Sequence, residues 1–342
     1  MLKAPMITGT RWRVLIPLVA LFVIVHALPV LAQVEGSRPP LGALVDIGQR
    51  RMHLHCTGSG SPVVVLEAGA SSFALDWALV QPPLARVTRV CSYDRAGHGW
   101  SDSATRGDTP ENIVRDLRTL LVVAGERGPF ILVGASRGGI YTRMYELMHP
   151  SDVAGMVFVD PSHEDRLFVD VDGKTVPIWA RSIDDIRAAL PPASAWDVVR
   201  AIISRPTRDP QTGVPFDRLP RDLYDTRVEF DRRLIQSGAP TTYDQYVEQE
   251  IGRQSAYVVL HERATSRERA LGDRPIVVLT RGTANDGLRT VHAGLAAEST
   301  NSRHTVVAGA DHEIHLFAPD AVIEAVLDVV EASRRGSRLP VR

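Results

Sequence analysis

Short apolar runs alternate with amphipathic stretches along most of the chain. Several runs, such as residues 63–66, 130–133 and 276–279, are continuously apolar, as expected of strands buried on both faces of a parallel sheet. Strand patterns occupy residues 42–47, 51–56, 62–67, 88–93, 129–135, 155–160, 275–280 and 304–307. Helical patterns occupy residues 76–85, 110–124, 137–148, 286–298 and 319–332. This alternation predicts an α/β fold with a doubly wound, mostly parallel sheet of eight strands.

The alternation is interrupted between the sixth and seventh predicted strands. Residues 161–274 are rich in Arg, Asp and Pro, and such a stretch is too long for a structureless loop. Helical patterns recur inside it at residues 183–190, 197–204, 223–237 and 243–268. We therefore expect a helical insertion after the sixth strand.

The first 32 residues have the pattern of a targeting segment. Three basic residues precede an almost uninterrupted apolar run over residues 14–32, which ends with small residues at alternate positions. This pattern predicts a secretory signal peptide over residues 1–32 and export to the periplasm or the extracellular space. An uncleaved anchor is the less favoured alternative, because two prolines and a histidine interrupt the run. With the segment removed, we expect no stable membrane association.

Composition and charge narrow the range of partners. The 342 residues are 44% hydrophobic and 23% charged, with a net charge of -1, which is typical of a globular protein. A nearly neutral chain lacks the positive field that nucleic acid requires, so we expect no nucleic-acid partner. His312, Glu313 and His315 lie close together, but the HExxH spacing of a metalloprotease is absent. We expect neither a metal nor a cofactor.

The strongest chemical signal is a G-x-S-x-G pattern at residues 134–138, which lies between a predicted strand and a predicted helix. Such a strand-to-helix turn is typical of a nucleophile elbow, which projects its serine, and a structural Gly-Ser turn is the alternative. The helix N-terminus supplies free N–H groups where an oxyanion would develop. Ser136 is thus the candidate nucleophile, and the backbone N–H of Arg137 is a candidate oxyanion donor.

Three motifs together make the chain similar to the α/β-hydrolase family. They are the elbow at residues 134–138, the stretch Tyr93–Ser101 after the fourth strand, and Gly309–His312 after the eighth. The resemblance extends over most of residues 33–342 and implies one α/β-hydrolase domain. It also implies a catalytic serine, acid and histidine in that chain order, and a cap after the sixth strand, where residues 161–274 lie.

The resemblance also indicates the base. The family places its catalytic histidine after the last strand, where His312 lies, and a serine needs such a base to become nucleophilic. We interpret the nearby His315 as the beginning of the turn into the last helix.

The acid has two candidates. The commoner family arrangement puts the acid after the seventh strand, where Asp286 lies, although Asn285 is nearer the usual spacing. In another arrangement, similar to that of some haloalkane dehalogenases, the acid follows the sixth strand, where Asp160 lies. A strand-end aspartate is held more rigidly than one in a glycine-flanked loop. We favour Asp160 and keep Asp286 as the alternative.

Two further expectations depend on the resemblance. The loop after the third strand should supply a second oxyanion donor, and the backbone N–H of Ala70 is the candidate, although the His-Gly sequence frequent in the family is absent there. Glu67, at the end of that strand, is either a structural or a functional carboxylate. In the family's strand order the second and fourth strands are neighbours, so Cys56 and Cys91 become a plausible disulfide pair, which export would preserve. Two buried free thiols are the alternative.

Together these residues predict a serine hydrolase that cleaves a carboxylic ester-type bond of a small molecule through an acyl-enzyme. A lactonase, a thioesterase, a carbon-carbon hydrolase or an aminopeptidase would use the same residues, because the cap rather than the triad selects the substrate. A non-enzymatic ligand-binding protein is a further alternative. Serine at the elbow, in place of aspartate, argues against haloalkane dehalogenase and epoxide hydrolase activities. The pattern does not determine the oligomeric state.

Overall fold

The computed structural model describes residues 38–104, 106–169, 175–203, 212–237, 242–266 and 270–340. The predicted signal peptide lies outside these residues, so its cleavage and the export of the protein stay predictions. Within the described ranges, none of the helices combines the length and the apolar character needed to cross a bilayer.

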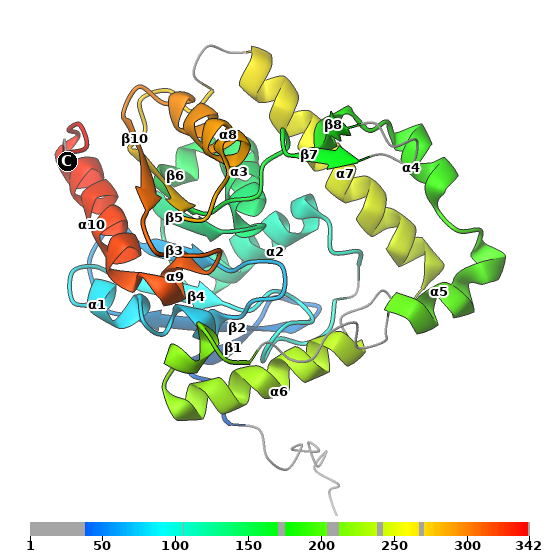
Figure 1. The fold of residues 1–342 in the computed structure, drawn as a ribbon. Coiled ribbons are helices and arrows are strands. Elements are labelled where there is room, and N and C mark those ends of the chain that lie inside the picture. Colours follow the sequence, from blue (N-terminus) through cyan, green and yellow to red (C-terminus); the bar gives the residue numbers. More distant parts are fainter. Residues whose placement is uncertain are drawn as a thin grey trace, which may run out of the picture. The chain divides into compact units, whose positions relative to one another are not determined.

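An eight-stranded sheet forms the centre of the unit that begins at Arg38 (Figure 1). Its strands are β1 (Ala43–Asp46), β2 (Arg51–Thr57), β3 (Val64–Glu67), β4 (Val90–Tyr93), β5 (Phe130–Ala135), β6 (Val153–Val159), β9 (Ile276–Arg281) and β10 (Ser302–Val307). The spatial order is β1-β2-β4-β3-β5-β6-β9-β10. Strand β2 is antiparallel to both its neighbours, and all other pairs are parallel. The predicted mostly parallel α/β sheet is confirmed, with one observed strand for each of the eight predicted.

Helices cover both faces of the sheet, because the strands carry apolar side chains on both faces. Val64 and Leu66 of β3 pack into one apolar cluster, whereas Val65 between them packs into another, because successive side chains of a strand point to opposite faces. The covering helices are α1 (Gln81–Ala85), α2 (Pro110–Val123), α3 (Gly138–Met148), α8 (Asp286–Ala297), α9 (Ile314–Phe317) and α10 (Pro319–Arg335). Helices α1 and α10 pack on one face, and α2, α3 and α8 pack on the other.

One predicted helix is wrong in detail. Residues 76–85 do not form a continuous helix, because a 3-10 turn at Ala74–Trp77 ends before α1 begins at Gln81. Pro82 and Pro83 occupy the first turn of α1. Proline is tolerated in a first turn but not in a helix interior, since it lacks an N–H donor.

The segment between β6 and β9 is mainly helical. It contains the two-stranded hairpin β7 (Leu167–Val169) and β8 (Thr175–Pro177), followed by α4 (Ile183–Ala189), α5 (Trp196–Ile203), α6 (Arg221–Ser237) and α7 (Tyr243–Ser266). All four helices overlap predicted ones, whereas the hairpin was not predicted, because three-residue strands carry too little alternation. The buried Arg227 of α6 donates a hydrogen bond to the buried Asp76 at 2.8 Å, which ties this segment to the loop after β3.

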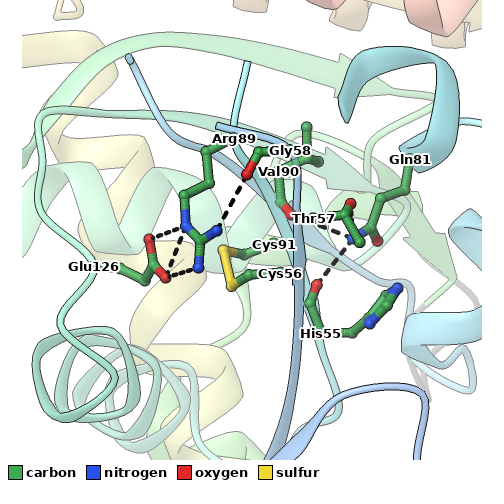
Figure 2. The surroundings of a disulfide bond; sticks show 9 residues. All are labelled: His55, Cys56, Thr57, Gly58, Gln81, Arg89, Val90, Cys91 and Glu126. Carbon is green, nitrogen blue, oxygen red and sulfur yellow. Dashed lines mark hydrogen bonds and ion pairs between the residues drawn. A yellow bond between two sulfur atoms is a disulfide. The ribbon is translucent and has the colours of Figure 1, made fainter. Parts of the chain in front are cut away.

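A disulfide joins β2 to β4 (Figure 2). Cys56 and Cys91 are direct partners in the antiparallel register, with their Cα atoms 4.0 Å apart. Beside the disulfide, the guanidinium of Arg89 binds both carboxylate oxygens of Glu126. The structure thus contains the pair that the strand order made plausible, in place of two free thiols.

Candidate active site

Ser136 lies in a tight turn between β5 and α3. Its backbone φ is +51°, a conformation that a residue with a side chain adopts only when its surroundings hold it. The turn requires glycine on both sides of the serine. A Cβ on Gly134 would lie 2.6 Å from the carbonyl oxygen of Gly138, and one on Gly138 would lie 2.5 Å from that of Glu67. The G-x-S-x-G pattern therefore arises from close backbone packing around the serine.

His312 contacts both Ser136 and Asp160. Its Nε2 atom lies 2.9 Å from the Oγ of Ser136, and its Nδ1 atom lies 2.6 Å from the Oδ2 of Asp160. An ionised carboxylate can only accept, so Nδ1 carries the hydrogen and Nε2 accepts from the serine hydroxyl. These contacts match the order expected of a serine nucleophile, a base beside it and a carboxylate that orients the base.

Asp160 is buried directly after β6 and, like Ser136, has a positive φ of +43°. Burial by itself would raise the pKa of Asp160, but the hydrogen bonds from His312 and from the backbone N–H of Arg281 outweigh it and lower this pKa. For His312, the hydrogen bond to Asp160 is the largest influence and raises the pKa of the imidazole above its ordinary value. The pair thus favours a charged carboxylate and a more basic histidine.

Two residues near Asp160 were missed by sequence reasoning: Arg281 of β9 binds Asp160 itself, and His292 of α8 binds the next residue, Pro161. The backbone N–H of Arg281 donates to Oδ1 of Asp160 at 3.1 Å, and its guanidinium donates to Oδ2 at 2.5 Å. The buried His292 donates from Nε2 to the carbonyl oxygen of Pro161 at 2.9 Å, so its Nδ1 accepts from the hydroxyl of Thr280 at 2.7 Å. The position of Arg281 at the carboxyl end of a parallel strand, where ligand sites of α/β sheets lie, was the available signal.

The other candidates for acid and base lie elsewhere. Asp286 is the exposed first residue of α8, and the Nδ1 of His312 is bonded to Asp160 instead. Asn285 caps α8 by accepting from the N–H of Leu288. His315 is buried, with its ring centroid 4.7 Å from that of Trp77, and burial lowers its pKa to about 3.

The two candidate oxyanion donors flank Ser136. Arg137 follows it at the beginning of α3, and Ala70 lies in the loop after β3. A Cβ on Gly69 would lie 3.3 Å from the Cβ of Ser136, so this loop packs directly against the serine. Within the described part of the chain, the N–H groups of Ala70 and Arg137 have no hydrogen-bond acceptor. Both are therefore available to a bound oxygen.

Among the described residues, one group of His, Cys, Asp and Glu side chains is close enough to share a metal ion. It consists of Cys56, Cys91 and Glu126. Both sulfur atoms of this group are bonded to each other in the disulfide.

Comparison with known proteins gives a family and several distant relatives. A sequence model of the Alpha/beta hydrolase family matches residues 53–325. A protein of Hormonema carpetanum named "Probable transporter efuK" is 36% identical over an alignment 129 residues long, which covers 35% of this chain and 18% of that protein. The chain spans 18% and 29% of the lengths of the first two curated relatives.

Two solved structures share the fold. The enol-lactonase from Burkholderia xenovorans LB400 is 18% identical with a TM-score of 0.55, and the likeness covers 84% of this chain and 99% of that one. Epoxide hydrolase CorEH is 18% identical with a TM-score of 0.58, over 83% of this chain and 95% of that one.

Proposed function

The chain belongs to the Alpha/beta hydrolase family, and on that premise we propose that it is a serine hydrolase that cleaves a carboxylic ester-type bond of a small molecule. One observation carries the proposal. The imidazole of His312 contacts the hydroxyl of Ser136 at 2.9 Å and the carboxylate of Asp160 at 2.6 Å. Serine is a weak nucleophile at neutral pH, and such a base beside it is what acyl transfer requires.

The first half of the reaction forms an acyl-enzyme. Nε2 of His312 takes the proton of the Ser136 hydroxyl while Oγ bonds to the ester carbonyl carbon. The carbonyl oxygen becomes an oxyanion, which the N–H groups of Ala70 and Arg137 stabilise. When the tetrahedral intermediate collapses, the bond to the alcohol oxygen breaks and His312 returns the proton to that oxygen.

The second half uses water in place of the serine. His312 takes a proton from a water molecule, whose oxygen bonds to the acyl carbon. Collapse of the second intermediate breaks the bond to Ser136 Oγ, which recovers its proton from His312. Asp160 remains ionised throughout and stabilises the imidazolium, which agrees with its lowered pKa.

We infer the type of bond that is cleaved from the nucleophile. We attribute the selection of the substrate to the segment inserted between β6 and β9. A serine forms an acyl-enzyme, which favours ester-type substrates over the epoxide substrate in the name of one structural relative. We assign residues 161–274 the role of a cap that selects the acyl and alcohol groups. Aromatic residues gather there: the ring centroid of Trp196 lies 6.1 Å from that of Tyr243 and 5.7 Å from that of Tyr246.

Replacement of the nucleophile tests the proposal. The substitution Ser136→Ala should lower the kcat for a short p-nitrophenyl ester by about 10⁴-fold or more, because the acyl-enzyme cannot form. Ser162→Ala is the matched control: the backbone N–H of Ser162 donates to the carbonyl oxygen of Ser136, and its hydroxyl has no part in the mechanism. Purified Ser136→Ala protein that turns over the ester at the original rate would overturn the proposal.

A further inference from the structure

A single buried arginine holds the backbone of the loop that carries Ala70. Arg95, two residues beyond the end of β4, is 3% exposed. Its guanidinium donates to three consecutive carbonyl oxygens, those of Ala68 at 2.8 Å, Gly69 at 2.5 Å and Ala70 at 3.1 Å. We propose that Arg95 is a positioning residue for the oxyanion hole, which sets the direction of the Ala70 N–H. This inference depends on the proposed function.

The planarity of the peptide bond links the guanidinium to the donor. The carbonyl of Gly69 and the N–H of Ala70 belong to one peptide unit, in which the two groups point in opposite directions. A hydrogen bond from Arg95 to the Gly69 oxygen therefore turns the Ala70 N–H away from Arg95. The backbone N–H of Ser72 also donates to the Gly69 oxygen, but at 3.3 Å. Without the shorter bond from Arg95 at 2.5 Å, the unit is held less firmly, because Gly69 has no side chain to restrict it.

The position of the loop supports this direction. The site of a Cβ on Gly69 is 3.3 Å from the Cβ of Ser136, so the peptide unit that follows lies beside the nucleophile. The N–H of Ala70 has no acceptor among the described residues. Its carbonyl oxygen, in contrast, accepts a hydrogen bond from Arg95 and lies 3.2 Å from the Nε2 of His98. The loop therefore binds its carbonyl groups internally and leaves a donor free next to the serine.

The surroundings of Arg95 explain why a charged group can be buried there. Its guanidinium donates to the carboxylate of Glu67 at 2.7 Å, and the hydroxyl of Tyr93 donates to the other oxygen of Glu67. A buried charge is tolerated when it is paired and hydrogen-bonded. Glu67, whose role the sequence left open, is the counter-ion of the arginine.

If Arg95 served only as the ion-pair partner of Glu67, it would not need hydrogen bonds to the loop carbonyls. Arg95 could balance Glu67 with one donor, yet three of its four hydrogen bonds go to successive carbonyls of one loop. A planar guanidinium presents several donors in a fixed fork, which an ammonium group cannot reproduce. Arg95→Lys therefore keeps the positive charge and removes the set of hydrogen bonds to the three loop carbonyls.

The first experiment compares Arg95→Lys with the control Tyr93→Phe, which alters the same buried network without touching the loop carbonyls. Loss of an oxyanion donor typically lowers kcat by about 10²-fold or more. We expect that loss in Arg95→Lys with KM within about threefold of its original value, because the ground-state contacts stay. The affinity for an aryl trifluoromethyl ketone should fall by a similar factor. Its adduct forms when Ser136 Oγ bonds to the carbonyl carbon and the proton passes to His312, which leaves an oxyanion in the hole.

A double-mutant cycle separates positioning from structure. Ala70→Pro removes the N–H itself, since proline has none. If Arg95 acts through that N–H, adding Arg95→Lys to Ala70→Pro should cost little further kcat, whereas independent roles would add. Additive losses, or Arg95→Lys protein with unchanged kcat and ketone affinity, would overturn the inference.

A substitute variant and a control cover the cases in which Arg95→Lys does not fold or the proposed function fails. If Arg95→Lys gives no cooperative thermal transition, the pair Glu67→Gln/Arg95→Gln, which keeps the buried site neutral, replaces it in the cycle. Its loss of kcat is then compared with that of Glu67→Gln alone. Failure of the proposed function is distinguished by Ser136→Ala, which would then retain turnover, whereas failure of this inference leaves the dependence on Ser136 intact.

Discussion

Two residues of the proposed triad are held in backbone conformations that are unfavourable for residues with side chains. Ser136 and Asp160 both have positive φ, +51° and +43°, and each costs on the order of 1 to 3 kcal/mol. Backbone bonds to neighbouring strands hold them, from the N–H of Ser136 to the oxygen of Val159 and from that of Asp160 to the oxygen of Leu279. Among the residues that the structure describes, Ser136 and Asp160 are the ones other than glycine that have positive φ.

Substitution of the two candidate acids should separate their roles. Asp160→Asn should lower kcat by about 10⁴-fold, because the imidazole loses the partner that fixes its tautomer. Asp286→Asn, the matched control on the exposed first turn of α8, should leave kcat unchanged. A larger loss in Asp286→Asn than in Asp160→Asn would contradict the assignment.

The native protein and Asp160→Asn should also differ in the pH dependence of kcat/KM. His312 acts as a base only when neutral, so kcat/KM should fall as the pH drops through its pKa, which the bond to Asp160 raises. In Asp160→Asn the pKa should move down toward the ordinary value near 6.5, and the acid limb should shift to lower pH. A pH profile of residual kcat/KM measures this shift, and an acid limb that stays in place would argue against the proposed pair.

Among single residues, the sequence predicted the site roles that a local motif indicates. It did not decide the roles that depend on contacts between distant parts of the chain. Ser136 is marked by its own flanking glycines. The choice between Asp160 and Asp286 depends on which strand end lies beside His312, and no local pattern records that. Arg281 was missed for the same reason, since its partner Asp160 is 121 residues away.

The arrangement of strands brings the site together. Ser136 follows β5, Asp160 follows β6, Arg281 ends β9 and His312 follows β10, and these four strands are consecutive neighbours in the sheet. Because the strands are parallel, their carboxyl ends lie along one edge. The central strands β3, β5 and β9 were predictable because each contains a continuous apolar run between turn residues, whereas β2 was predictable from its alternating pattern. The short hairpin β7–β8 was not, because it has no such run.

The disulfide between β2 and β4 should contribute to stability. It closes a loop with a sequence separation of 35 residues, for which chain entropy predicts about 3 to 4 kcal/mol. Urea unfolding of oxidised and fully reduced protein should therefore show a lower free energy of unfolding after reduction. The double variant Cys56→Ala/Cys91→Ala should be insensitive to reductant. Coincident curves for the two forms of the native protein would show that the disulfide does not stabilise the fold.

At the scale of the whole molecule, the eight-stranded sheet agrees with membership of the Alpha/beta hydrolase family. The segment between β6 and β9 is the part to which we assigned the selection of substrates. The residues from β6 to β9 contribute α4 to α7, and α6 and α7 both contact the core. Arg227 of α6 binds Asp76, and Glu248 of α7 accepts from the N–H of Gly107 at 3.0 Å. A net charge of -1 and family membership do not select a substrate, so specificity is expected to reside in this segment. The signal peptide and export stay predictions.

Covalent labelling of the native protein tests the central claim most directly. A fluorophosphonate probe reacts with a serine only when a base activates it, and the serine oxygen displaces fluoride from phosphorus. Mass spectrometry of the labelled, digested protein should place one phosphonyl group on Ser136, and labelling should be lost in Ser136→Ala and strongly reduced in His312→Ala. An unlabelled native protein, or a label on another residue that persists in Ser136→Ala, would contradict the assignment of Ser136 as an activated nucleophile.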